Sequence, residues 1–261
     1  MELRPLGSTG MWVSPLGLGT VKLGRNQQVK YPSTFKLPDD RQVLVLLDLA
    51  HELGINLIDT APAYGSSQER LGRLLGARRK DWLIVSKVGE IFANGESRFD
   101  FSFDHTIATV EQSLRTLNTE YLDCVLIHSD GDDLRILQHE GALDALRELK
   151  ARDLIRSHGM SSKTVEGGLR TVREMDVVMA TCNLEYNEEL PVLEAAQAQG
   201  KGVLIKKGLM SGHVQDPDGV QRSFTHILSQ PGVSSMIVGT INPDHLRDNV
   251  AALERAIAGS P

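Results

Sequence analysis

Short apolar runs alternate with longer amphipathic stretches through most of this chain of 261 residues. The apolar runs are about four to seven residues long, as in buried strands, and the amphipathic stretches repeat with the period of a helix. We expect strands at residues 16–20, 55–59, 83–87, 122–128, 155–160, 177–181, 203–206 and 235–239. We expect helices at residues 40–53, 67–75, 104–117, 133–151, 163–173, 190–199, 220–228 and 243–257. This alternation predicts βα units around a parallel sheet.

Eight such units in about 240 residues predict an α/β fold, a (β/α)8 TIM barrel, as one domain over residues 1–261. A β-hairpin is expected at residues 2–14, where it would close the bottom of the barrel. A doubly wound sheet is the alternative. It is disfavoured because the first βα turn, Gly19 to Gly24, does not have the Gly-x-Gly-x-x-Gly pattern of a phosphate loop.

Composition narrows the class of protein further. Hydrophobic residues make up 41% and charged residues 24% of the chain, which suits a soluble globular protein. No apolar run approaches the roughly 20 residues of a membrane span, and the start has no apolar signal region. Cys124 and Cys182 fall in strand-like runs, so we interpret them as buried thiols of a cytoplasmic protein. The net charge of −6 disfavours a nucleic-acid partner.

Four polar residues stand at or just after the ends of three expected strands. They are Asp59, Tyr64, Lys87 and His128. Each alone has a structural explanation: a turn cap, a rim aromatic, a lysine reaching solvent and a core histidine. Because the carboxyl ends of parallel strands meet on one face of a barrel, we expect these four residues to share a site.

The chemistry that these residues can share is proton transfer to a carbonyl oxygen. A phenol has a reference pKa of about 10, so Tyr64 needs a nearby cation that stabilises its phenolate. Lys87 can supply that cation, and Asp59 can hold the lysine charged and in place. His128 can donate a hydrogen bond to the substrate oxygen. Carbonyl reduction also needs a hydride, which no side chain provides.

Longer motifs resemble the aldo-keto reductase family over nearly the whole chain. The matching segments are residues 6–10, 54–65, 69–72, 85–88, 113–117, 121–123, 126–128 and 159–161. The resemblance implies a (β/α)8 barrel, a nicotinamide cofactor bound in extended form, and a catalytic tetrad of Asp59, Tyr64, Lys87 and His128. In that tetrad Tyr64 is the general acid.

The cofactor side departs from the family pattern. Ser161-Ser162 stands where members usually have Ser-Asn, and Asn183 stands where they have Gln. Lys206 and Lys207 replace a Tyr that commonly stacks on the nicotinamide. The resemblance implies cofactor contacts from Gly19, Thr20, Lys22, Ser161, Ser162, Asn183, Lys206, Lys207, Gly239, Thr240, His245 and Asn249. The two lysines either favour a pyrophosphate or weaken affinity for the nicotinamide half.

We therefore expect an NAD(P)H-dependent aldo-keto reductase that reduces a small aldehyde or ketone, with NADP(H) favoured over NAD(H) by family habit. The alternatives are a cofactor-binding, redox-sensing protein with little turnover, and an NAD-dependent sugar or polyol dehydrogenase. No heptad pattern indicates an obligate assembly, so we expect a monomer or weak oligomer without membrane or nucleic-acid partners. Family members often have a longer tail that closes over the substrate; ending at Pro261 predicts a shallow, permissive pocket.

Two further features leave alternatives open. Residues 24–38 and 89–103 are longer than a barrel needs, and their aromatic residues either shape a substrate pocket or only pin the loops to the rim. Those aromatic residues are Tyr31, Phe35, Phe92, Phe99 and Phe101. Asp130, Asp132 and Asp133 lie beside His128, but we expect no metal site, since Asp132 or Asp133 is well placed to cap the next helix.

Overall fold

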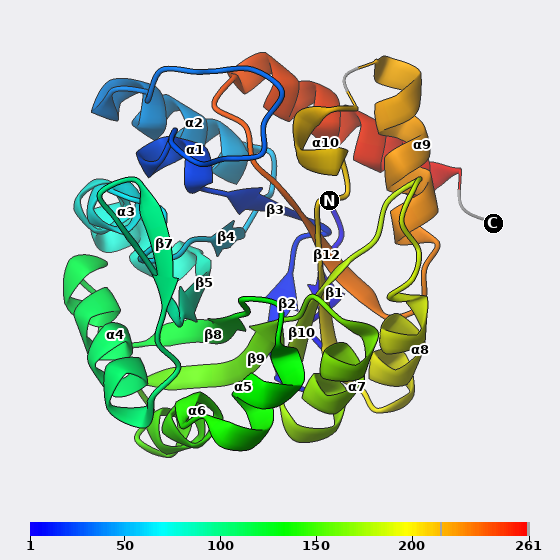
Figure 1. The fold of residues 1–261 in the computed structure, drawn as a ribbon. Helices are drawn as coiled ribbons and strands as arrows, with labels where there is room; N and C mark the ends of the chain where they lie inside the picture. The colour runs from blue at the N-terminus through cyan, green and yellow to red at the C-terminus, as the bar shows by residue number, and fades with distance from the viewer. Residues whose placement is uncertain (215, 260–261) are drawn as a thin grey trace.

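A computed structural model describes residues 1–214 and 216–259. In this part of the chain eight parallel strands close into a barrel, each pairing with the next in order, and the last with the first (Figure 1). The strands are β3 (Leu16–Gly19), β4 (Leu57–Asp59), β5 (Leu83–Val88), β8 (Leu122–His128), β9 (Ile155–Ser161), β10 (Val177–Thr181), β11 (Gly202–Lys206) and β12 (Val233–Val238). The predicted (β/α)8 barrel is confirmed.

Helices cover the outside of the barrel, as Figure 1 shows. They are α1 (Val21–Gly24), α2 (Asp40–Glu52), α3 (Ser67–Leu75), α4 (Phe103–Thr116), α5 (Asp133–His139), α6 (Ala142–Ala151), α7 (Val165–Glu174), α8 (Leu190–Ala198), α9 (Pro217–Leu228) and α10 (Pro243–Ala258), with short 3-10 helices η1 (Gly76–Asp81) and η2 (Met210–Gly212). None of the helices in the described ranges is long and apolar enough to cross a membrane.

The single helix expected at residues 133–151 is in fact two, α5 and α6. The break comes at Gly141, which packs directly on the backbone of Phe103 at the start of α4. A Cβ at this position would lie 2.5 Å from the Phe103 nitrogen, so the close approach requires glycine. Periodicity did not reveal the break because buried apolar residues continue from α5 into α6, at Ile136, Leu137, Leu143 and Leu146.

The expected N-terminal hairpin is present as β1 (Arg4–Pro5) and β2 (Trp12–Val13). Leu6 and Val13 are fully buried and pack with apolar residues that point into the barrel, such as Leu57 and Leu204. The hairpin is also tied to β12, because the Arg4 guanidinium donates to the Val233 carbonyl at 3.1 Å. It therefore closes the barrel interior at one end and leaves chemistry to the other.

A second hairpin was not foreseen. It consists of β6 (Glu90–Ala93) and β7 (Glu96–Phe99), within the segment expected to be a loop. Asn94 and Gly95 form its turn with positive φ angles of 54° and 81°, which is the Asn-Gly pattern that favours tight hairpins. The hairpin begins just after β5 and carries Glu90 to the site described below.

Candidate active site

The strand ends at the mouth of the barrel bring the four expected polar residues together. Asp59 ends β4, Lys87 lies near the end of β5, and His128 ends β8, while Tyr64 follows β4 in a short turn. The Lys87 ammonium contacts Oδ1 of Asp59 at 2.5 Å and lies 4.8 Å from the centre of the Tyr64 ring. The rings of Tyr64 and His128 meet edge to face at 6.2 Å.

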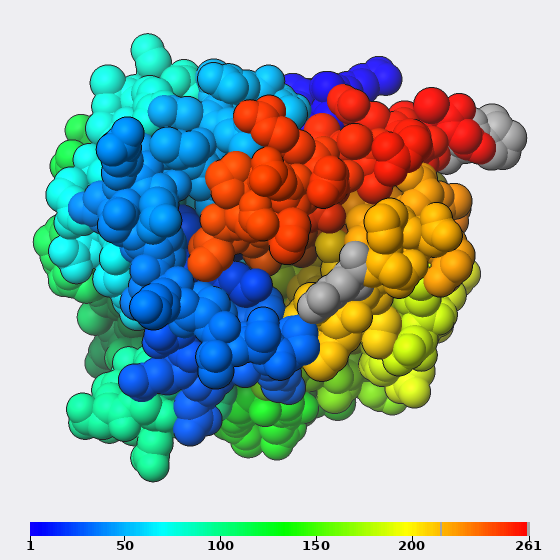
Figure 2. Space-filling view, turned by 90° about the horizontal axis from the view of Figure 1, so that it is seen from above, coloured from blue at the N-terminus to red at the C-terminus, as the bar shows by residue number. Residues whose placement is uncertain are grey.

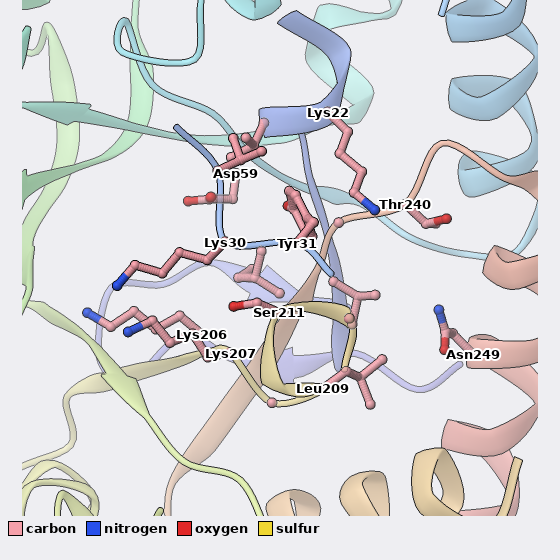
Figure 3. A pocket seen from close by; sticks show the side chains of 18 of the residues that line it. Lys22, Lys30, Tyr31, Asp59, Lys206, Lys207, Leu209, Ser211, Thr240 and Asn249 are labelled. Atoms are coloured by element: carbon pink, nitrogen blue, oxygen red, sulfur yellow. The ribbon is translucent and has the colours of Figure 1, made fainter. Parts of the chain in front are cut away.

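These residues line one large cavity, with a volume of about 920 Å³. Figure 2 shows the segments that surround its mouth: the loop after α1 in blue, the segment after β11 in gold and the start of α10 in orange-red. Figure 3 shows Asp59, Lys30, Lys206 and Lys207 on one side of the cavity and Thr240 and Asn249 on the other, with Lys22 directed toward Thr240. Asp59 therefore faces Thr240 and Asn249 across the cavity.

Burial controls the electrostatics of the acid–base residues. Asp59 and Lys87 are 4% and 2% exposed, and Lys87 also donates to the Thr60 carbonyl, so its charge is well satisfied. Burial, followed by the charges of Asp59 and Glu90, raises the pKa of Tyr64 well above its usual value. Lys87 was expected to lower that pKa, but its ammonium is directed at Asp59. Tyr64 consequently stays a protonated hydrogen-bond donor at neutral pH.

A carboxylate that sequence reasoning missed, Glu90 of β6, contacts the histidine. Its Oε2 lies 2.8 Å from Nδ1 of His128, and its side chain is only 11% exposed. Arg25 forms an ion pair with Glu90 at 3.1 Å and also donates to the Ala63 carbonyl next to Tyr64. The available signal was a charged residue three positions after Lys87, close to the end of a strand.

Most of the expected cofactor residues also line the cavity. These are Gly19, Lys22, Ser161, Lys206, Lys207, Gly239, Thr240, His245 and Asn249. Three others do not: Thr20, Ser162 and Asn183. Thr20 donates to the Asp59 carbonyl at 2.9 Å, and Asn183 accepts hydrogen bonds from the backbone of its own turn, at residues 185 and 186. These two side chains therefore hold the strand ends that frame the site.

Lys206 is held at the wall of the cavity by two acceptors. Its ammonium donates to Oγ of Ser161 at 2.8 Å and to the carbonyl of Ser162 at 2.5 Å. Burial, partly offset by the charge of Glu189 and reinforced by Lys207, lowers the pKa of Lys206 to about 7. The charge of Lys206 therefore responds to pH near neutrality.

The segment that follows Lys206 is strained. Lys207, Met210 and Ser211 have φ angles of 57°, 51° and 58°, a region that residues other than glycine rarely adopt. Asn183 supports this backbone by donating to the Lys207 carbonyl at 3.3 Å. Such strain is typical of segments shaped for a ligand.

The two aromatic loops have different roles. Tyr31 reaches into the cavity, where burial and then the charge of Asp59 raise its pKa to about 12. In the second loop Phe92 stacks on the Arg25 guanidinium at 3.5 Å, while Phe99 and Phe101 stack on each other at 5.9 Å. The first loop therefore shapes the pocket, and the aromatic residues of the second pin the hairpin that carries Glu90.

The acidic residues Asp132 and Asp133, near His128, accept hydrogen bonds from backbone amides. Asp132 caps α5 by accepting from the Arg135 amide at 3.3 Å. Asp133 is buried and accepts from the amides of Lys163 and Thr164 at 2.8 Å, which fixes the start of α7.

Comparison with known proteins identifies the family. The Aldo/keto reductase family matches residues 15–224, so the chain belongs to the aldo-keto reductases. A crystal structure from Pseudomonas aeruginosa, assigned to the same family, is 53% identical, covers 98% of this chain and 96% of its own, and has a TM-score of 0.91. The uncharacterized oxidoreductase YqkF of Bacillus subtilis is 28% identical over 97% of this chain and 91% of its own length. L-Galactose dehydrogenase of Arabidopsis thaliana is 26% identical over 97% and 88%. Oxidoreduction with a nicotinamide cofactor is therefore the class of chemistry of this family.

Proposed function

We propose that this protein is an NAD(P)H-dependent oxidoreductase that reduces small aldehydes or ketones to alcohols. The observation that carries the proposal is the convergence of Tyr64, His128 and the buried Lys87–Asp59 pair at one end of the cavity. A carbonyl oxygen placed there meets a protonated phenol that is itself largely buried. General acid catalysis of this kind contributes about 10²–10⁴-fold to a rate.

The rest of the cavity fits an elongated, anionic cofactor. Lys22, Lys206 and Lys207 line it, and no ion pair joins any of them to a carboxylate in the described ranges. Gly19 and Gly239 also line the cavity, and a Cβ on Gly239 would lie 3.1 Å from the Tyr31 hydroxyl, so glycine lets Tyr31 lie against this wall. When bound, the nicotinamide cofactor supplies the hydride that no side chain can supply.

NADP(H) is the proposed cofactor rather than NAD(H). His245 and Arg255 line the end of the cavity near Asn249, where they can meet a phosphate on the ribose. Asp248 lines the same end, and its negative charge would repel the phosphate and so weaken the preference. We therefore propose a moderate preference for NADP(H).

Oxidation of a sugar or polyol is the second candidate function. Similarity to L-galactose dehydrogenase over 97% of this chain favours it. The same side chains serve both directions, because a group that donates a proton to a carbonyl oxygen can take it back from an alcohol.

Titration with NADPH and with NADH, followed by protein fluorescence or calorimetric heat, tests the cofactor assignment. We expect both to bind, NADPH more tightly. A panel of aldehydes, ketoses and sugars is then assayed in both directions with the tighter cofactor. No binding of either cofactor would contradict the proposed function.

The Tyr64→Phe variant tests the acid. It removes only the phenolic hydroxyl, so we expect carbonyl reduction to fall by about 10²–10⁴-fold while the Kd of NADPH stays within about twofold. Tyr186→Phe removes a hydroxyl outside the cavity and is the matched control. Activity close to that of the unmodified enzyme in Tyr64→Phe would show that Tyr64 is not the acid.

A further inference from the structure

Glu90 is the carboxylate in contact with the active-site histidine, and each of its two oxygens has a distinct partner. Oε2 lies 2.8 Å from Nδ1 of His128. Oε1 accepts a hydrogen bond from Oγ of Ser97 at 2.6 Å and another from the Arg25 guanidinium at 3.1 Å. Burial alone would raise the pKa of Glu90, but contacts with His128, Ser97 and Arg25 lower it to about 2. Glu90 is therefore a carboxylate at every pH at which the enzyme is expected to work.

This contact decides which nitrogen of His128 carries the proton. Nδ1 is buried, and it has no well-aligned acceptor among the described residues, so the short contact to Glu90 is its only polar interaction there. If Nδ1 were unprotonated, its lone pair would face a carboxylate oxygen at 2.8 Å, and the two would repel. Nδ1 must therefore carry a proton. Because a neutral imidazole has one N–H, Nε2 is then the bare nitrogen.

We propose that Glu90 is a positioning residue that fixes the proton of His128 on Nδ1, so that Nε2 accepts a hydrogen bond when the ring is neutral and donates one only when the ring is protonated. A carbonyl oxygen can only accept a hydrogen bond, so it needs the N–H that Nε2 carries in the protonated ring. An alcohol hydroxyl can donate a hydrogen bond to the bare Nε2 of the neutral ring. The link to substrates rests on the proposed function, whereas the proton position rests on the contact itself.

Several groups around His128 influence its charge. Burial lowers the pKa of His128, Glu90 raises it, and the ammonium groups of Lys87 and Lys206 lower it. Tyr64 faces the ring edge as a neutral phenol. The net direction is downward, so His128 is mostly neutral at pH 7. At that pH the site presents an acceptor at Nε2, and carbonyl reduction is expected to improve as the pH falls.

Nuclear magnetic resonance of the ligand-free protein tests the proton position without any turnover. In ¹⁵N-labelled protein, long-range ¹H–¹⁵N spectra distinguish a protonated ring nitrogen from a bare one, and loss of signals in a His128→Gln variant assigns the ring. We expect neutral His128 to have its proton on Nδ1. A proton on Nε2 in the unmodified protein would overturn the proposal, whatever the enzyme does with substrates.

Glu90→Gln is the decisive variant, because the structure suggests how glutamine would fit. Its carbonyl oxygen can keep the hydrogen bonds from Ser97 and Arg25, while its amide nitrogen takes the place of Oε2 facing His128. An amide N–H donates to a bare Nδ1, so we expect the proton to move to Nε2. Loss of the carboxylate should also lower the pKa of His128 by about one unit or more. Glu96→Gln makes the same change at an exposed position of the same hairpin and should change neither property.

The kinetic consequence separates this role from a merely structural one. In the unmodified enzyme, kcat/KM for reduction should fall as the pH rises through the pKa of His128. The Glu96→Gln variant should show the same fall at the same pH. In Glu90→Gln the neutral ring already donates from Nε2, so this fall should be absent. A Glu90→Gln profile that keeps the fall at the same pH would overturn the proposal. If no variant turns over any carbonyl, the proposed function fails, and the nuclear magnetic resonance result still decides the proton position.

Discussion

Two sets of residues that line the cavity, the acid–base residues and the expected cofactor contacts, differ in how their charges are balanced. At the acid–base end Lys87 is paired with Asp59 at 2.5 Å, and Glu90 is paired with both Arg25 and His128. Among the expected cofactor contacts, here called the cofactor end, Lys206 and Lys207 lie on the same side of the cavity as Asp59, and Lys22 lies toward Thr240. None of these three lysines has an ion pair to a carboxylate of residues 1–214 and 216–259, and the segment that follows Lys206 contains three non-glycine residues at positive φ.

This difference shows which parts of the site are complete before ligands arrive. Paired, buried charges hold the acid–base residues in one arrangement, which lowers the reorganisation needed during reaction. Unpaired cations beside strained backbone store unfavourable energy that a bound anion can relieve. Substitutions at the first end should therefore affect stability as well as rate, and those at the second should affect mainly cofactor binding.

The largest effect is expected for Lys87→Met. It leaves the Asp59 carboxylate buried without its partner, and breaking a buried ion pair of this kind costs about 3–5 kcal/mol of the free energy of unfolding. Denaturant unfolding followed by circular dichroism measures this loss. Lys80→Met, at an exposed position, should cost less than about 0.5 kcal/mol. A loss equally small in Lys87→Met would mean that the acid–base end is not held together by its charges.

The acid–base end is also the part that the sequence predicted well. Asp59, Lys87 and His128 are polar residues that interrupt or end apolar runs, and a parallel barrel brings strand ends to one face whatever the loops do. Local pattern and topology together were sufficient there. The sequence did not predict a role for Glu90, because its partner His128 is 38 positions further along the chain and its segment was expected to be a loop rather than a hairpin.

The cofactor end was predicted less well, because its contacts depend on orientation. Ser162 and Asn183 follow strands just as Ser161 does, but only Ser161 lines the cavity. Ser161 ends β9 with its hydroxyl on the Lys206 ammonium, whereas Asn183 belongs to a turn that uses its side chain internally. A shift of one residue past a strand end reverses the direction of a side chain, and no periodicity extends into such turns. The last residues of the chain, including Pro261, lie outside the described residues, so the expected shallow pocket stays a prediction.

An intermediate effect is expected for Lys206→Met, which changes one of the expected cofactor contacts. With a pKa of about 7, Lys206 is mostly charged below that pH and mostly neutral above it. An anionic cofactor favours the charged form, so the affinity for NADPH should weaken as the pH rises above about 7, by at most tenfold per unit. In Lys206→Met this dependence should disappear, and at pH 6 the affinity should be roughly tenfold lower than that of the unmodified protein. Calorimetry in buffers of different ionisation enthalpy measures the accompanying proton uptake.

Lys207→Met is the matched control for this comparison. Lys207 is adjacent to Lys206 and also carries an ammonium group, but it is exposed and donates no hydrogen bond to Ser161 or Ser162. It should lower affinity less than Lys206→Met and leave the pH dependence in place. A pH dependence that survives in Lys206→Met would show that another group at the cofactor end titrates near neutrality.

The smallest effect is expected for His245→Arg, at the far end of the cavity. His245 is exposed, and a guanidinium offers a permanent charge and two parallel donors to a ribose phosphate, a geometry that an imidazole ring cannot offer. The Kd of NADPH should therefore fall by about twofold to fivefold while that of NADH stays constant, since NADH lacks the phosphate. Arg247→Lys keeps a cation two residues away, outside the cavity lining, and should leave both values unchanged. An unchanged ratio of the two Kd values in His245→Arg would remove His245 from the cofactor site, while the acid–base end would remain as described.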